Sequence, residues 1–184
     1  QIHTGIGFGT WDIRVENESS TAQDGTVYHN ARKAIDEAKK SLEYSTLFYS
    51  KNKNDIIINS LINAATLLAF KQSEYQNKLM LLAEILYPIA SEDIIDYKNL
   101  KEILKFVQFK KKENLILDID YPIISTQLEK ESFYITEGKK RGLSTQISKL
   151  LGVSRQSVEK SIKIGDIYEL RNLTIAVLKA MDNV

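Results

Sequence analysis

The chain has 184 residues, of which 43% are hydrophobic and 27% are charged, and its formal net charge at pH 7 is +1. This composition excludes a wholly disordered chain, and the absence of cysteine excludes disulfides, thiolate zinc sites and cysteine nucleophiles and favours a reducing, cytoplasmic location. The most apolar stretches, 60–70 and 79–90, are too short to cross a bilayer of about 30 Å, so we expect no membrane partner.

The first 50 residues predict a partial α+β segment. Residues 2–15 are rich in strand formers, and their three alternate glycines indicate a close backbone approach or a bulge. A polar stretch at 16–25 predicts a loop, the apolar spacing of 26–41 predicts a helix, and 42–50 predict a strand. Because the chain starts at Gln1, directly before an apolar stretch, we expect it to be a fragment or to have lost an N-terminal segment.

Residues 51–184 predict a helical domain. The boundary with the first segment is expected at 51–54, where the chain is polar but has no proline–glycine linker. A polar break is expected at 109–114, and 115–121 fit either a short strand or the start of a helix. The predicted helices are 54–70, 73–87, 92–107, most of 122–138, 144–151, 154–164 and 166–181. The predicted fold class is therefore α+β and mainly helical, with a small partial sheet at the N-terminus followed by an all-α domain.

Residues 144–164 have the pattern of a DNA-reading helix-turn-helix unit. Gly152 interrupts an otherwise helical stretch, and it falls where the chain must turn with a positive φ, which glycine adopts without a steric penalty. Val153 is expected to fill the corner of the turn, and Ser154 is expected to cap the second helix. The residues expected to pack the two helices against each other are Ile147, Ser148, Leu151, Val158 and Ile162.

The side chains left outside the second helix suit contacts with DNA. Arg155 can read guanine and Gln156 can read adenine through bidentate hydrogen bonds in the major groove, while serines and lysines can hold phosphates. Seven basic residues (Lys139, Lys140, Arg141, Lys149, Arg155, Lys160, Lys163) and one acidic residue (Glu159) lie between positions 139 and 163, a local clustering typical of a DNA-binding surface. The predicted DNA contacts are Ser144, Thr145, Lys149, Ser154, Arg155, Gln156, Ser157, Glu159, Lys160 and Lys163.

Two stretches near the N-terminus carry a family resemblance. "GIGFG" at 5–9 and "DGTVYHNARKAIDEAKK" at 24–40, together with the C-terminal helix-turn-helix, resemble the bacterial SatD family. The resemblance implies a nucleotidyl-cyclase-like or polymerase-palm-like domain fused to a helix-turn-helix. It also implies an acidic metal-site motif of the "GDEFQ" kind, which this chain lacks and which would precede Gln1. If Arg32 takes the position of the cyclase arginine, Tyr28 stands where a cyclase has asparagine.

The other candidate groups in the chain give weaker indications. His29 and Arg32 lie near a predicted helix start that could hold an anion, although a surface pair is the more common outcome. The chain has two histidines, His3 and His29, which are far apart in the sequence, so we expect no zinc site. Asp118 and Asp120 could bind a divalent ion, but such pairs more often face solvent. We therefore expect no catalytic residue, no cofactor and no metal.

These patterns favour a sequence-specific DNA-binding protein, a transcriptional regulator that inserts helix 154–164 into the major groove of double-stranded DNA. A homodimer is an open alternative to a monomer, because the apolar helix 166–181 could pair two copies or could pack onto the helix-turn-helix. Two other functions stay open: a fragment of a nucleotide-handling enzyme whose metal-site half is missing, and a protein-interaction module with a solvated basic face.

Overall fold

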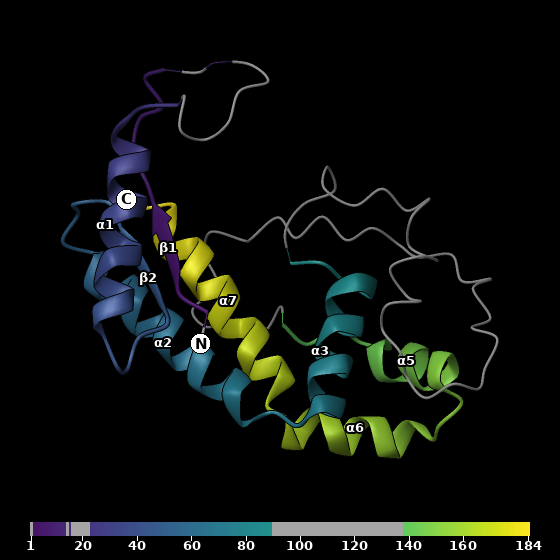
Figure 1. Cartoon of the computed structure of the whole chain (residues 1–184). Coiled ribbons are helices and arrows are strands. Elements are labelled where there is room, and N and C mark those ends of the chain that lie inside the picture. Colours follow the sequence, from purple (N-terminus) through teal and green to yellow (C-terminus); the bar gives the residue numbers. More distant parts are fainter. Residues whose placement is uncertain (1, 14, 16–22, 90–137) are drawn as a thin grey trace. The chain divides into compact units, whose positions relative to one another are not determined.

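The computed structural model describes residues 2–13, 15, 23–89 and 138–184, to which the structural findings refer (Figure 1). The described part is mainly helical, with a small parallel sheet near the N-terminus, which confirms the predicted α+β class. Its elements are β1 (Thr4–Gly7), α1 (Thr26–Lys40), β2 (Thr46–Tyr49), α2 (Asp55–Lys71), α3 (Glu74–Leu86), α5 (Leu143–Leu151), α6 (Arg155–Ile164) and α7 (Ile167–Met181).

The chain divides into two compact units, one formed by Gln1–Leu67 with Ala176–Val184 and the other by Leu68–Ile175. This division falls within α2, later than the polar stretch at 51–54 where the sequence places the boundary. The physical reason is that Ile58 and Ile62, early in α2, pack with Phe48 of β2 in one apolar cluster. The first half of α2 therefore belongs with the sheet.

In the first unit, α1 lies directly against one face of the two-stranded sheet. β1 and β2 are parallel, with Ile6 opposite Phe48, and α1 connects them. A Cβ atom on Gly5 or Gly7 would collide with the backbone of Ala31 in α1. The close backbone approach predicted from the alternate glycines is thus confirmed, and it explains why these positions have no side chain.

The opposite face of the sheet carries the core of the first unit. Side chains alternate along a strand, so Ile6, between the two glycines, points away from α1. It packs with the buried Phe48, with Ile58 and Ile62 of α2, and with the last turns of α7. Both strands are shorter than the extended stretches predicted at 2–15 and 42–50. Before β2, the Ser41 hydroxyl accepts hydrogen bonds from the backbone of the next residues and holds a turn there.

Several predictions fall outside the described residues. They are the helix at 92–107, the break at 109–114, the ambiguous stretch 115–121, most of the helix at 122–138, part of the loop at 16–25, and the possible ion ligands Asp118 and Asp120. Among the helices that are described, none combines the length and the apolar character that a membrane span requires.

The second unit is built around α3. Ser73 begins this helix with a capping box, in which its side chain accepts from the Gln76 backbone while the Gln76 side chain accepts from the Ser73 backbone. Apolar side chains from α3, α5, α6 and the first turn of α7 form one buried cluster. The Tyr87 hydroxyl also donates to the Gln146 side chain of α5 at 2.5 Å. α3 is therefore the support against which α5 and α6 are held.

Candidate nucleic-acid interface

A tight turn at Gly152 joins α5 and α6. Gly152 has φ 62° and ψ 26°, the left-handed conformation in which a Cβ atom is strained. The backbone N–H of Val153 bonds back to the Ser148 carbonyl at 3.2 Å, which closes the end of α5. Ser154 is extended, and its hydroxyl accepts a 3.2 Å bond from the Ser157 N–H. The predicted roles of Gly152 and Ser154 are confirmed.

The packing of the two helices follows the expected pattern with one exception. Ile147, Val158 and Ile162 are buried, and Leu151 is partly buried against the same cluster. The expectation that Val153 fills the corner is wrong, because its side chain is 40% exposed. Leu143, Ile147 and Leu150 are instead the buried residues of α5, and they belong to one cluster with the leucines of α3.

Most predicted DNA contacts lie exposed on α6 or beside it. Thr145 is partly buried, whereas Ser144 is buried and turned toward α6. The exposed members of the set are Lys149, Ser154, Arg155, Gln156, Ser157, Glu159, Lys160 and Lys163. Eight of the ten predicted contacts are therefore exposed, and we define the exposed polar residues of α6, together with Lys149 and Ser154, as the basic face.

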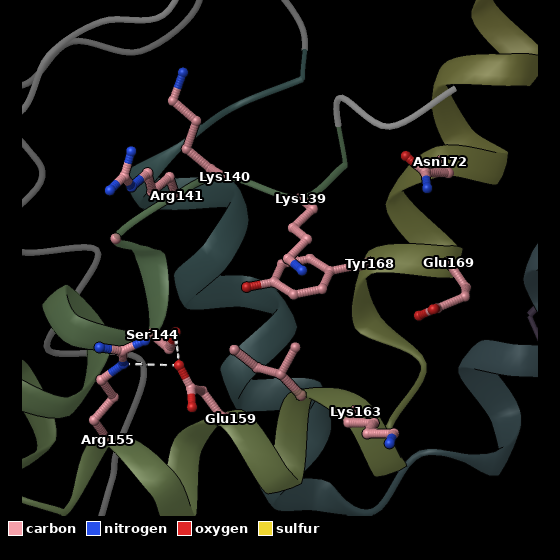
Figure 2. Close-up of a pocket in the computed structure, with 12 residues that line it drawn as sticks. Lys139, Lys140, Arg141, Ser144, Arg155, Glu159, Lys163, Tyr168, Glu169 and Asn172 are labelled. Carbon is pink, nitrogen blue, oxygen red and sulfur yellow. Dashed lines mark hydrogen bonds and ion pairs between the residues drawn. The ribbon is translucent and has the colours of Figure 1, made fainter. Parts of the chain in front are cut away.

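Glu159 of the basic face accepts hydrogen bonds from two side chains, those of Arg155 and the buried Ser144. Arg155 Nε donates to Glu159 Oε1 at 2.7 Å, and the Ser144 hydroxyl donates to the same oxygen at 3.3 Å (Figure 2). Arg155 and Glu159 are four residues apart and thus neighbours on one side of the helix. The two terminal nitrogens of Arg155 have no partner among the described residues, so its forked end is available.

The other cations of the region are unpaired within the described part of the chain. Lys149, Lys160 and Lys163, together with the stretch 139–141 before α5, form no ion pair there. Positive charge that no internal carboxylate neutralises attracts polyanions from solution. The basic face and the 139–141 stretch thus have the charge that a nucleic acid requires.

A buried arginine fixes the start of the 139–141 stretch. Arg171 of α7 is 3% exposed; it forms an ion pair with Glu84 and donates to the carbonyls of Tyr87 at 2.5 Å and Gly138 at 3.0 Å. Asn172 accepts from the Gly138 N–H at 2.8 Å. Burial lowers the pKa of Arg171 and raises that of Glu84, although each charge partly offsets the effect on the other.

Sequence reasoning did not single out Arg171, although the residue spacing in α7 indicates that this position is buried. Ile167, Arg171 and Ile175 are spaced four apart and all three are buried, so the cation interrupts a buried stripe of the helix. A cation in such a position needs a carboxylate or carbonyl partner. The apolar face of α7 is also used inside the chain, since Ile167 joins the core of the second unit and Val177 that of the first. Packing within the chain thus accounts for the apolar residues of α7, and dimerisation through this helix stays a prediction.

A cavity of about 750 Å³ opens beside the basic face, between the 139–142 stretch, α6 and α7. Figure 2 shows Lys139 pointing toward Tyr168, whereas Lys140 and Arg141 point away from it. Arg155 and Glu159 line it from α6. The cavity therefore lies directly beside the exposed side chains of the basic face.

The weaker candidate, the His29 and Arg32 pair in α1, lies on an exposed surface. His29 Nε2 is 3.2 Å from a carboxylate oxygen of Asp24, so its nearest charged neighbour is an acid. A separate cavity of about 300 Å³ lies at the carboxyl ends of β1 and β2, but neither His29 nor Arg32 lines it. In the described residues no three His, Asp or Glu side chains are grouped as metal ligands. His29 and Arg32 therefore lie outside this cavity, and anion binding by the pair stays a prediction.

Comparison of the chain with protein-family models, with curated proteins and with solved structures finds no match.

Proposed function

We propose that this chain is a sequence-specific DNA-binding protein that acts as a transcriptional regulator in the cytoplasm, with α6 lying in the major groove. The observation that supports it most is the combination of a Gly152 turn, a fully packed α5–α6 pair and a reading helix whose outer side chains are exposed. A helix of this kind fits the major groove, and its first residues are the ones that reach base edges.

The polar groups on α6 suit this role. Arg155 and Gln156 lie in the first turn and carry bidentate donors and acceptors for guanine and adenine, respectively. Lys149, Lys160 and Lys163 would hold phosphates on either side. Membership in the SatD family, a homodimer as an alternative to a monomer, and the absence of enzymatic activity stay predictions from the sequence.

Salt-dependent binding to DNA tests the proposal. Fluorescence anisotropy with a random duplex pool at two salt concentrations should give an affinity that falls steeply as salt rises, because bound phosphates release counterions. Lys160→Glu should abolish most of this affinity. The matched control, Lys39→Glu, makes the same charge change on the exposed side of α1 and should leave it nearly unchanged. No binding at low salt, or an equal loss in both variants, would contradict the proposal and favour a protein-interaction module.

A second candidate function has one observation in its favour. The smaller cavity lies where two parallel strands end beside the start of α1, and Gly9, Thr26, Asn30 and Lys51 line it. Ligands of parallel α/β proteins bind at this edge of the sheet. A nucleotide-handling enzyme fragment would use it, and isothermal titration with a nucleoside triphosphate and Mg²⁺ tests that function separately from DNA binding.

A further inference from the structure

The cavity beside the basic face has an excess of positive charge. Five cations and two carboxylates line it, and the carboxylates are Glu159 and Glu169. Arg155 is paired with Glu159, but Lys139, Lys140, Arg141 and Lys163 have no carboxylate partner within the described residues. Cations without a carboxylate partner that line one hollow favour an anionic occupant, and Figure 2 shows that Lys139 points toward Tyr168 whereas Lys140 and Arg141 point away from it.

The same cavity also offers a surface for a ring. Tyr168 lines it among the charged groups and is partly buried. Burial raises the pKa of Tyr168, with a smaller opposing effect from its hydrogen bond to Ser144, so its hydroxyl stays protonated at neutral pH and does not repel an anion. The volume of about 750 Å³ is within the range of small-molecule sites.

We infer that this cavity binds a small organic phosphate that carries an aromatic ring, and that the bound molecule competes with DNA for α6. The phosphate would lie at Lys139, which points toward Tyr168 in Figure 2, and the ring would pack against Tyr168. Competition follows because Arg155, Glu159 and Lys163 belong both to the cavity wall and to the basic face. The competition with DNA rests on the proposed DNA-binding function, whereas binding of the small molecule does not.

Phenyl phosphate is the probe that tests the site, because it has one ring and one phosphate. Titration of the full, ¹⁵N-labelled chain should shift the backbone amide signals of Gly142, Ser144 and Tyr168, with a Kd on the order of 1 mM or lower. Inorganic phosphate should bind about fivefold more weakly or worse, because it lacks the ring. Equal affinity for both probes, or shifts that avoid the cavity, would overturn the inference.

Two lysine variants separate the site from general charge attraction. Lys139→Glu reverses an exposed charge in the cavity and should weaken phenyl phosphate binding by about tenfold. Lys39→Glu makes the same change on α1, which does not line the cavity, and should alter binding by less than about twofold. If both variants lose affinity equally, the probe senses only net charge and the inference fails.

A competition measurement distinguishes failure of this inference from failure of the DNA proposal. Phenyl phosphate should displace a labelled duplex from the wild-type chain, and it should do so much less effectively from Lys139→Glu. DNA binding without any probe binding would overturn the cavity site and leave the DNA proposal intact. Probe binding without DNA binding would leave the site and overturn both the competition and the DNA-binding function.

Discussion

Arg155 and Glu159 of α6 are joined by a 2.7 Å bond between Nε and Oε1, and Ser144 of α5 shares the same carboxylate oxygen. The bond occupies one edge of the guanidinium and leaves the forked end without a partner among the described residues. An exposed pair of this kind contributes only about 0–1 kcal/mol. Glu159 therefore holds Arg155 only weakly, so the proposed contact with a guanine can still form.

Arg155→Ala should weaken binding to the preferred DNA sequence by about 1–3 kcal/mol and relax the preference at one base pair. The loss reflects two hydrogen bonds to a single base, so random DNA should be affected less. Competition binding with the preferred duplex and with all single-base variants of it measures both effects. An equal loss on every sequence would assign Arg155 to a phosphate.

Lys149→Ala should weaken binding to all sequences by a similar factor, because a phosphate contact carries no sequence information. The slope of log Kobs against log salt should become smaller in magnitude by about one unit. Anisotropy over a series of salt concentrations measures the slope, and Lys39→Ala is the control with an exposed lysine on α1. An unchanged slope would remove Lys149 from the interface.

Gly152→Ala should lower the free energy of unfolding by about 1–2 kcal/mol, since an alanine at φ 62° is strained. Urea denaturation measures the change, with Val153→Ala as the control one residue away. Val153 is 40% exposed, so its truncation should cost less than about 0.5 kcal/mol. A larger loss for Val153→Ala than for Gly152→Ala would contradict the geometry of the turn.

Arg171→Ala should destabilise the chain by about 3–5 kcal/mol, because it leaves Glu84 without its cation and two backbone carbonyls without a donor. Arg155→Ala breaks an exposed ion pair and is the matched control, with a cost below about 1 kcal/mol. Thermal and urea unfolding of the two variants test whether Arg171→Ala is the more destabilising. Similar stabilities would show that the buried pair contributes little.

Glu84 should make stability depend on pH in a defined direction. Burial raises its pKa above the usual 4.5, in spite of the attraction of Arg171, so the folded state binds the proton more readily than the unfolded state. The contribution of Glu84 to the free energy of unfolding should therefore increase as the pH falls from neutral through the raised pKa, and level off below about 4.5. The stability of the wild type minus that of Glu84→Gln, measured from pH 7 to pH 4, should rise. A fall over that range would contradict the direction of the pKa shift.

The helix-turn-helix could be predicted from the sequence because local rules determine it. A glycine at the turn, a serine cap and buried residues at helical spacing each leave a direct trace in the chain, and Gly152, Ser154 and Val158 are found as expected. The close approach of α1 to β1 could be predicted in the same way, because Gly5 and Gly7 leave room for it.

The features that sequence reasoning missed depend on contacts between distant residues. Arg171 meets Glu84, which lies 87 positions away, and nothing in the local pattern of α7 identifies that partner. Val153 is 40% exposed although it follows the turn glycine directly, which a local pattern does not reveal. The cavity likewise arises only when the 139–142 stretch, α6 and α7 come together.

Selection of duplexes from a random pool, followed by sequencing of the bound fraction, tests the central claim most directly. The wild-type chain should enrich a short site, and Gln156→Ala should lose the preference at one adenine of that site while keeping the rest. Enrichment of no sequence, or an identical site for wild type and for variants at Arg155 and Gln156, would contradict the assignment of α6 as a reading helix.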